Sequence, residues 1–435
     1  MKKALLFLLA LSLLVIPVFA NGGSDTPKEN EKSQLSIIWW GSQDRHNRTI
    51  KVIELYMENN PNVEITYEFS GWNDYWTKVT TMAAGGMLPD IMQQDYSQLY
   101  NWKSKNLLDS WDSSIDAGLI DLSDVGDSAL SGGRIDGKLY GINLGMNSQC
   151  IIMDLDAFEK AGIDVPPQNW TWDEFEALSK KIYDKQGIYS IISLYSQQQW
   201  KSLYLANGEW AYSDDGKSLG YTDDSLYVNF LKMIKRLTEY GAYPTRDIEI
   251  ADYGKGDNSE QQPIITKEAA MAYTWSNLIT AISSAAGDDR RFYMTHLPRL
   301  KSDGPASNFL KPSMFFSLTT NSRNPDEAAR FVNFFTNNLE ANKILMADRG
   351  VPISSKIQDG LAPLLGEPAR MAFEYIGRVA QDCSPVPEPD PVGHQEIMND
   401  VFVPRVIDPI AFGEISAEEG VALLRTEAEK ILKNN

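Results

Sequence analysis

The chain has 435 residues, of which 43% are hydrophobic and 23% are charged. At about 150 residues per domain this length predicts two or three domains, and the composition excludes a wholly disordered, collagen-like or multi-span membrane protein. The formal net charge of -19 disfavours binding to nucleic acid or to an anionic membrane surface, because such a chain repels phosphate groups.

The first twenty residues have the pattern of a secretory signal peptide. Lys2 and Lys3 precede an apolar stretch at 4–16, and Val18 and Ala20 suit a cleavage site. We therefore expect export to the periplasm or to the outer face of the cytoplasmic membrane, with cleavage after Ala20. A membrane anchor is the alternative, but the apolar stretch is shorter than the ~20 residues that cross a bilayer. No cysteine for lipoprotein attachment lies near this cleavage site. Residues 21–33, which are polar, are expected to form a flexible tether.

Alternating strands and helices are predicted in the next 60 residues. In two segments the apolar residues recur with helical spacing, which predicts helices. In three other segments they alternate with polar residues or form short runs, which predicts strands. The strands are expected at 35–40, 63–69 and 90–93, and the helices between them at 49–58 and 72–83. This order predicts parallel β-α-β units with right-handed crossovers.

The remainder of the chain is richer in helix signals. Two capping boxes, at 171–174 and 416–419, each mark a helix start, and Asn324 followed by Pro325 marks another. Further expected elements are a helix at 154–161 that ends at Gly162, a hairpin at 210–221, and a helix that continues to Leu237.

The search for metal, cofactor or catalytic motifs is negative. Cys150 and Cys383 are expected to be buried free thiols, and a disulfide between them is the alternative in an exported protein. The three histidines (46, 296 and 394) are isolated, and the sequence has no phosphate-binding loop, dinucleotide fingerprint or nucleophile elbow. We therefore expect no metal, no cofactor and no catalytic residues.

Aromatic residues at predicted strand ends are the main candidates for a binding site. Trp40 ends the first strand, Asp95 and Tyr96 follow the third, and Trp275 follows an apolar strand at 269–273. In open α/β sheets ligands bind beyond the carboxyl ends of the strands, and aromatic rings stack on the C–H faces of sugars. Core packing is the alternative for any single tryptophan, but several at strand ends favour a polar, ring-shaped ligand.

Short segments of characteristic order and spacing run through nearly the whole mature chain. They are Trp40 with Gly41, 83–91, Asp95, 158–163, 166–167, 172–175, 269–271, Trp275, 324–329 and 350–352. Together they resemble the extracellular solute-binding proteins of carbohydrate ABC importers, the group that includes the maltose-binding proteins.

The resemblance implies an α/β, two-lobed periplasmic-binding-protein fold (type II), with a hinge and with the ligand in the cleft between the lobes. The first lobe would comprise 34–144 and 297–337, and the second would comprise 145–296 and 338–435. Trp72 has no family counterpart, but the turn at Gly71 places it within reach of the cleft. The other implied ligand contacts are Trp40, Gly41, Ser42, Arg45, Asp95, Tyr96, Gln198, Trp200, Trp275, Ser276, Asn277, Met314 and Arg349.

The function implied is capture of a sugar or oligosaccharide and its delivery to the permease subunits of an ABC transporter, by a monomer and without a reaction. Two alternatives stay open: a secreted polysaccharide-degrading enzyme and a binding protein for a non-sugar solute. Arg45, His46 and Arg48 could meet a uronate carboxylate, since Arg binds carboxylates with two hydrogen bonds. The alternative for these three residues is a solvated helix start.

Overall fold

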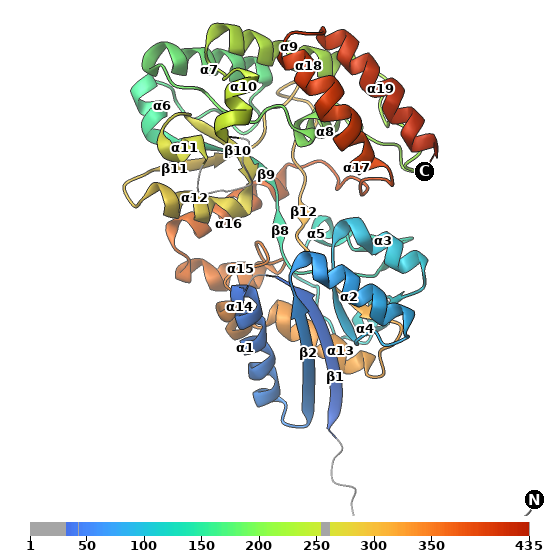
Figure 1. Cartoon of the computed structure of the whole chain (residues 1–435). Coiled ribbons are helices and arrows are strands. Elements are labelled where there is room, and N and C mark those ends of the chain that lie inside the picture. Colours follow the sequence, from blue (N-terminus) through green and yellow to red (C-terminus); the bar gives the residue numbers. More distant parts are fainter. Residues whose placement is uncertain (1–31, 42, 254–261, 435) are drawn as a thin grey trace, which may run out of the picture.

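The computed structural model describes residues 32–41, 43–253 and 262–434, which form two lobes stacked one above the other in Figure 1. The expected signal peptide, its cleavage site and Ser42 lie outside the described residues. Within these ranges, every helix is too short or too polar to cross a membrane.

The first lobe, the lower one in Figure 1, is built on a mixed sheet. Its elements are β1 (Ser33–Trp40), α1 (Gln43–Asn59), β2 (Val63–Ser70), α2 (Trp72–Ala84), β3 (Ile91–Gln94), α3 (Tyr96–Ser104), β4 (Leu108–Asp109), α4 (Asp112–Asp116), α5 (Asp127–Ser131), β5 (Arg134–Ile135), β6 (Lys138–Leu139), β7 (Ile142–Asn143), β13 (Phe315–Thr319), α13 (Pro325–Asn337), α14 (Leu339–Leu345), α15 (Ser355–Leu361) and η4 (Ala362–Leu364).

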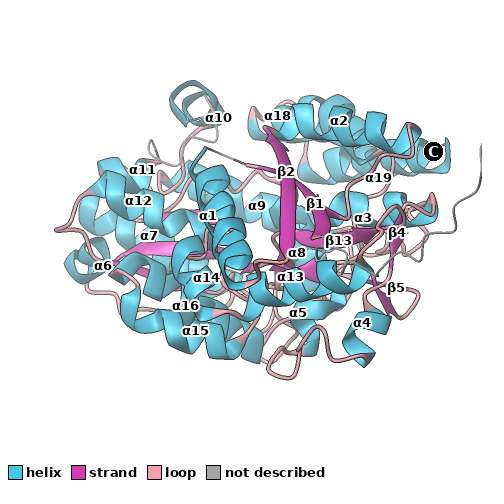
Figure 2. Cartoon of the chain, turned by 90° about the horizontal axis from the view of Figure 1, so that it is seen from below, coloured by secondary structure: helices cyan, strands magenta, loops and turns pink. Residues whose placement is uncertain are grey.

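The strand order of that sheet is β2-β1-β3-β13-β4, and β7 also pairs with β13. β1 is parallel to β2 and to β3, and β13 runs antiparallel to β3. Helices lie on both sides of β1 and β2, as Figure 2 shows. The predicted β-α-β units are therefore confirmed.

Helix α1 begins at Gln43, although the spacing of apolar residues predicts a start at residue 49. The additional first turn is polar, and aromatic contacts of His46 hold it in place. The ring of His46 stacks on Phe69 with centroids 4.1 Å apart. His46 Nδ1 accepts a hydrogen bond from Trp39 Nε1 at 3.1 Å. These contacts join the first turn of α1 to the ends of β1 and β2.

The second lobe surrounds a three-stranded antiparallel sheet of order β10-β9-β11. Its elements are β9 (Gln149–Asp154), α6 (Leu155–Ala161), α7 (Trp172–Gln186), α8 (Gln197–Leu205), α9 (Ser225–Tyr240), α10 (Arg246–Ile248), η1 (Glu249–Tyr253), α11 (Pro263–Thr266), β10 (Met271–Trp275), η3 (Ser276–Leu278), α12 (Ile279–Ala286), β11 (Phe292–Thr295), α16 (Glu367–Gln381), α17 (His394–Glu396), η5 (Ile397–Ile407), α18 (Asp408–Ala411) and α19 (Ala417–Asn434).

Strand β9 is buried on both faces. Cys150 and Ile152 enter the hydrophobic core that also holds residues of α12 and α16, whereas Ile151 and Met153 enter the core that holds residues of α7, α9 and α19. Alternate side chains of a strand point to opposite faces, so an unbroken apolar run suits a strand covered on both sides. Both cysteines are free thiols; Cys150 is buried and Cys383 is partly buried.

Two short strands, β8 (Met146–Asn147) and β12 (Lys311–Pro312), pair with each other where the chain passes between the lobes. The adjacent Gly145 has no room for a side chain, because a Cβ there would lie 2.3 Å from the carbonyl oxygen of Arg349. This close approach fixes the position of 349–351 beside β8, where Met146 also bridges Val351.

The lobe boundaries differ from those implied by the resemblance in two places. Helices α14 and α15, expected in the second lobe, lie on the first, because α14 packs against α1 and Arg48 donates to the carbonyl oxygen of Ile344. Residues 297–309 are expected in the first lobe, but the start of this segment lies on the second lobe, where Arg299 N donates to Trp170 O at 2.8 Å.

Local signals in the sequence correctly mark several helix ends. Thr171 and Glu174 form the capping box of α7, and Ser416 and Glu419 exchange the equivalent hydrogen bonds before α19. The hairpin expected at 210–221 forms in a short version: Tyr212 and Leu219 make one antiparallel bridge, Ser213 N donates to Ser218 O at 3.0 Å, and Gly220 N donates to Ala211 O at 3.1 Å.

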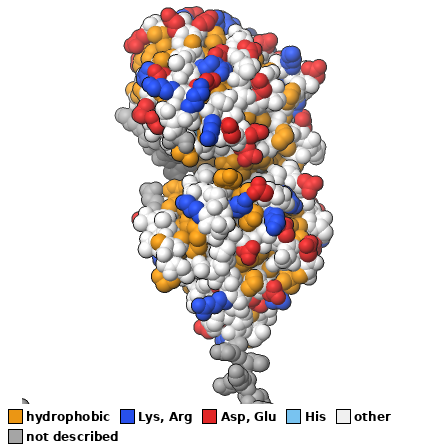
Figure 3. All heavy atoms as spheres, turned by 90° about the vertical axis from the view of Figure 1, so that its right-hand side faces the viewer, with side chains coloured by type: hydrophobic (Ala, Val, Ile, Leu, Met, Phe, Trp, Pro, Cys, Tyr) orange, Lys and Arg blue, Asp and Glu red, His pale blue; other side chains and the backbone are white. Residues whose placement is uncertain are grey.

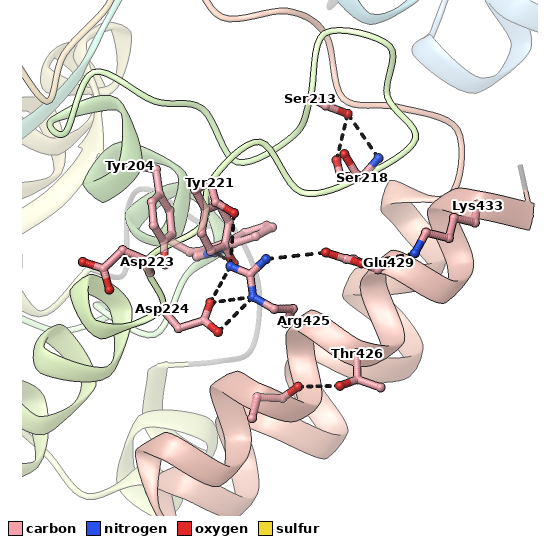
Figure 4. A network of polar contacts seen from close by, with 12 residues as sticks. Tyr204, Ser213, Ser218, Tyr221, Asp223, Asp224, Arg425, Thr426, Glu429 and Lys433 are labelled. Carbon is pink, nitrogen blue, oxygen red and sulfur yellow. Dashed lines mark hydrogen bonds and ion pairs between the residues drawn. The ribbon is translucent and has the colours of Figure 1, made fainter.

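Arg425 attaches the C-terminal helix to the second lobe. Its guanidinium donates to both carboxylate oxygens of Asp224 at 2.7–3.0 Å and to the carbonyl oxygen of Tyr221 at 3.2 Å (Figure 4). It also lies 4.7 Å from the centroid of the Tyr221 ring. The bonds to Asp224 raise the pKa of Arg425, so the guanidinium stays charged.

Candidate functional site

A cavity of about 160 Å³ lies between residues of the two lobes. It is lined by Asp95, Tyr96, Ser97, Gln149, Gln198, Lys201, Ser202, Trp210, Trp275, Phe309, Lys311, Pro387, Glu388, Pro389 and Asp390. The first lobe supplies 95–97 and the second lobe supplies most of the remainder. We call this space the interlobe cavity. Figure 3 shows the constriction between the lobes, where hydrophobic side chains reach the surface.

The first-lobe wall comes from the turn between β3 and α3. Asp95 caps α3, and its carboxylate accepts hydrogen bonds from the backbone N and the Oγ of Ser97 at 2.9 and 2.6 Å. The hydroxyl of Tyr96 donates to the carbonyl oxygen of Pro387 on the opposite wall. Burial raises the pKa of Tyr96, so the hydroxyl keeps its proton and holds the two walls together.

Three aromatic rings give the second-lobe wall its apolar character. Trp275 is the last residue of β10, and Lys311 Nζ lies 5.7 Å from the centroid of its ring. The rings of Trp210 and Phe309 meet edge to face with centroids 6.3 Å apart. The Nε1 of Trp210 is buried and has no hydrogen-bond partner in the described ranges.

An ion pair fixes the loop at 387–390 against α8. Lys201 Nζ donates to the two carboxylate oxygens of Asp390 at 2.5 and 2.7 Å. His394 Nε2 lies 3.4 Å from the same carboxylate, and the other ring nitrogen of His394 is 2.6 Å from the Tyr212 hydroxyl. Burial, together with the charge of Lys201, lowers the pKa of His394 to about 4, so this ring is neutral at pH 7.

The structure brings four of the expected ligand contacts together in this cavity: Asp95, Tyr96, Gln198 and Trp275. The other expected residues that the structure describes lie elsewhere. Asn277 is exposed beyond the end of β10, and Trp72 lines a separate groove on the first lobe.

Three expected contacts, Trp40 and Gly41 at the end of β1 and Arg349, are engaged within the first lobe. Trp40 is only 7% exposed and packs edge to face on Trp72 and Tyr75. A Cβ at Gly41 would lie 2.4 Å from the side chain of Arg45. Arg349 is 3% exposed and donates to Gln93 Oε1 at 3.1 Å and to Thr49 Oγ1 at 2.9 Å. Burial lowers the pKa of Arg349 to about 9.

The three residues considered for a uronate carboxylate are already engaged with the protein. Arg45 Nε donates to Asp348 Oδ2 at 2.8 Å, and Arg48 donates to the carbonyl oxygens of Ile344 and Leu345. His46 is buried beneath Phe69. They form neither a ligand-facing cluster nor a solvated helix start, because α14 covers this end of α1.

The remaining expected contacts are core residues of this structure. Trp200 is 0% exposed, and its Nε1 donates to the hydroxyl of Tyr221 at 3.1 Å. Ser276 is buried against Ser148, whose backbone N donates to Ser276 Oγ. Met314 is buried beside Leu144, to which it is joined by a backbone hydrogen bond.

Several lining residues were missed by the sequence reasoning. They are Ser97, Gln149, Lys201, Ser202, Trp210, Phe309, Lys311 and the loop at 387–390. The loop carries a signal that was available: the prolines at 385, 387, 389 and 391 alternate with other residues, which indicates an extended segment without helix or strand pairing. No group of three His, Cys, Asp or Glu side chains suited to a metal ion occurs in the part of the chain that the structure describes.

Comparison with known proteins gives matches along most of the chain. The family model described as bacterial extracellular solute-binding protein matches residues 51–363. A solved extracellular solute-binding protein family 1 from Alicyclobacillus acidocaldarius is 27% identical, covers 93% of this chain and 99% of that chain, and superimposes with a TM-score of 0.82. A periplasmic oligogalacturonide binding protein from Yersinia enterocolitica is 24% identical over 92% of this chain and 99% of that chain, with a TM-score of 0.74.

A Brucella abortus protein named for a binding role is 25% identical over 168 residues, or 38% of this chain. The chain spans about two fifths of the length of the curated relatives that it matches, 39% of that protein. The near-complete structural coverage, together with the two lobes, confirms the fold class expected from the sequence.

Proposed function

The chain belongs to the family of bacterial extracellular solute-binding proteins, and from this premise we propose that it captures a neutral oligosaccharide in the interlobe cavity and delivers it to the permease subunits of an ABC transporter. It acts by binding alone, without a reaction. The single observation that carries the proposal is the lining of the cavity, in which the rings of Trp275, Trp210 and Phe309 occur together with amide, hydroxyl and charged side chains.

The chemistry of the lining suits a sugar. Rings supply flat surfaces for the C–H faces of a sugar, while Asp95, Gln149 and Gln198 supply acceptors and donors for its hydroxyl groups. Ligand sites of binding proteins combine an apolar lining with a few placed polar groups in this way. A relative of the same fold from Yersinia enterocolitica was solved with saturated digalacturonic acid, which supports a carbohydrate ligand of some kind.

The charge of the lining favours a neutral sugar over an acidic one. Three carboxylates, those of Asp95, Glu388 and Asp390, stand against two ammonium groups, those of Lys201 and Lys311. Lys201 is already paired with Asp390. Only Lys311 is then left in this lining to meet an added carboxylate, so a ligand with several uronate groups would face net repulsion.

Capture would work by closure of the lobes. Residues 95–97 on one lobe and Trp275 on the other would contact the same sugar, so the ligand stabilises the closed state through contacts that an open state lacks. The hydrogen bond from Tyr96 to Pro387 would add to closure without a ligand.

A thermal-shift screen tests the proposal. Gluco-oligosaccharides of two to six units, with α or β linkages, are compared with digalacturonic acid, a short peptide and a glycerophosphodiester. A ligand at about 100 Kd adds about 2.7 kcal/mol of stability, a readily measured rise in Tm. We expect neutral sugars to raise Tm and digalacturonic acid to have a smaller effect; a peptide or phosphodiester that alone raises Tm would contradict the proposal.

Two further measurements test the parts of the proposal that concern turnover and export. Incubation of the pure protein with the best ligand for a day should leave that sugar intact, and shortened products would favour the enzyme alternative. Mass spectrometry of the exported protein should show a chain that begins at Asn21, and an intact Met1 would refute cleavage after Ala20.

A further inference from the structure

A second, larger hollow lies on the first lobe between α2 and α3, outside the interlobe cavity. Its volume is about 580 Å³, and we call it the α2–α3 groove. It is lined by Trp72, Trp76, Thr80, Ala83, Ala84, Gln98, Asn101, Trp102, Lys105 and Leu107. Figure 3 looks onto the side that carries these two helices and shows hydrophobic side chains exposed among polar ones.

The groove follows from the helical spacing of its residues. Trp72, Trp76 and Thr80 are four residues apart on α2, so they share one face of that helix. Gln98, Asn101 and Lys105 recur at intervals of three and four residues along α3 and its C-cap, and they line the groove together with Trp72 and Trp76 of α2. The groove thus combines rings from both helices, since Trp102 belongs to α3, with polar side chains that lie mainly on α3.

The rings of the groove form a connected group with one open member, Trp72. Trp72 is 44% exposed although its ring contacts Trp40 and Trp76 edge to face, with centroids 5.0 and 5.4 Å away. The rings of Trp76 and Trp102 lie 6.2 Å apart. The Nε1 of Trp76 is buried and has no hydrogen-bond partner among the residues described. An unpaired buried N–H costs free energy, which a ligand hydroxyl that reached it would remove.

Helix α3 connects the groove to the interlobe cavity. Tyr96 and Ser97 at its start line the cavity, and the next residue, Gln98, lines the groove. The helix has nine residues, or about 13 Å at 1.5 Å per residue. A chain molecule bound in the cavity therefore needs to pass only the first turn of α3 to enter the groove.

We propose that the α2–α3 groove is an extension of the ligand site that takes additional sugar units of a longer oligosaccharide. The inference rests on the proposed function. Its lining combines tryptophan faces, two amides, a hydroxyl and one ammonium group, with no carboxylate, which suits a sugar more than an apolar chain or a cationic partner. Trp72 is the stacking platform, and Gln98 and Asn101 bind hydroxyl groups.

The test asks whether the effect of each substitution on affinity depends on the length of the sugar. Affinities of gluco-oligosaccharides of two to six units are measured by calorimetry for the full-length mature protein and for Trp72→Ala, Asn101→Ala and Trp275→Ala. Tyr100→Ala is the matched control, because Tyr100 is a 61% exposed aromatic residue of α3 that lines neither hollow.

We expect Trp72→Ala to weaken binding of the longer sugars about tenfold and to leave the disaccharide unchanged. Asn101→Ala, which keeps all three rings, should weaken only the longer sugars, and Tyr100→Ala should change neither. Trp275→Ala should weaken every length. If the wild type and Trp72→Ala bind the longer sugars with equal affinity, the inference is overturned while the proposed function stands. The same holds if Trp72→Ala loses affinity equally for sugars of every length. Failure of the wild type to bind any of these sugars would instead count against the proposed function, and the inference would fall with it.

Discussion

Two tryptophans that look equivalent in the sequence are expected to respond differently to the same substitution. Trp40 and Trp275 each stand at the end of a strand, but Trp40 is packed among Trp72, Tyr75 and Trp76, whereas Trp275 is partly exposed in the interlobe cavity. We predict that Trp40→Ala lowers stability and that Trp275→Ala lowers ligand affinity.

The size of each effect follows from what the ring contacts. Trp40→Ala removes a buried indole from among three rings with centroids 5.0–5.6 Å away. Such truncations cost about 3–5 kcal/mol, and at about 2–4 °C per kcal/mol the Tm should fall by roughly 10 °C. Trp275→Ala loses mainly its contact with Lys311, worth about 0.5–1 kcal/mol at an exposed site. If the ring stacks on the sugar, its loss costs ~2 kcal/mol or more of binding free energy, about thirtyfold in Kd.

The assay is a pair of measurements on each variant: Tm without ligand, and Kd by calorimetry for the best sugar of the screen. Trp275→Phe serves as the matched control, because it keeps a smaller ring and should retain part of the affinity. A fall of about 10 °C for Trp275→Ala with unchanged Kd, alongside a stable Trp40→Ala that binds weakly, would refute the reasoning.

Three further predictions concern closure, the C-terminal helix and pH. Tyr96→Phe removes the hydrogen bond to Pro387, worth about 1 kcal/mol; small-angle scattering without ligand should show a more open molecule, and an unchanged profile would contradict this. Arg425→Ala should lower the free energy of unfolding by about 1.5–3 kcal/mol through loss of the bonds to Asp224, with Kd unchanged and only partial rescue by Arg425→Lys, as urea unfolding would show. In the folded protein the pKa of His394 is lowered from 6.5 to about 4. As the pH falls below 6.5, the unfolded chain therefore takes up a proton at His394 before the folded protein does. The contribution of the neutral ring to the free energy of unfolding is complete above pH 6.5 and declines toward pH 4. His394→Gln should flatten the decline of unfolding free energy over that interval, and a slope equal to that of the wild type would argue against the assignment.

Local structure and family were predictable because they depend on neighbouring residues and on ordered short segments. The capping boxes at 171–174 and 416–419 form as expected, since each is closed by groups three residues apart. The parallel strands β1, β2 and β3 follow from the alternation of apolar runs and helical spacing.

The cavity was only partly predictable, because exposure depends on contacts between distant segments. Trp200 lies in α8, where every residue from 199 to 205 is buried. The spacing of apolar residues in this helix therefore does not indicate which face contacts a ligand. Arg45 was a candidate ligand contact until the fold brought Asp348 to within 2.8 Å of its guanidinium.

The sequence by itself determined the strands, the helix starts and the membership in a binding-protein family, all of which rest on short-range signals. Only the tertiary structure decided which tryptophans are core and which line a cavity, since the walls come from 95–97, α8, the end of β10 and a loop at 387–390. That loop is held by Lys201, 189 residues earlier in the chain, and no local pattern encodes a contact of that separation.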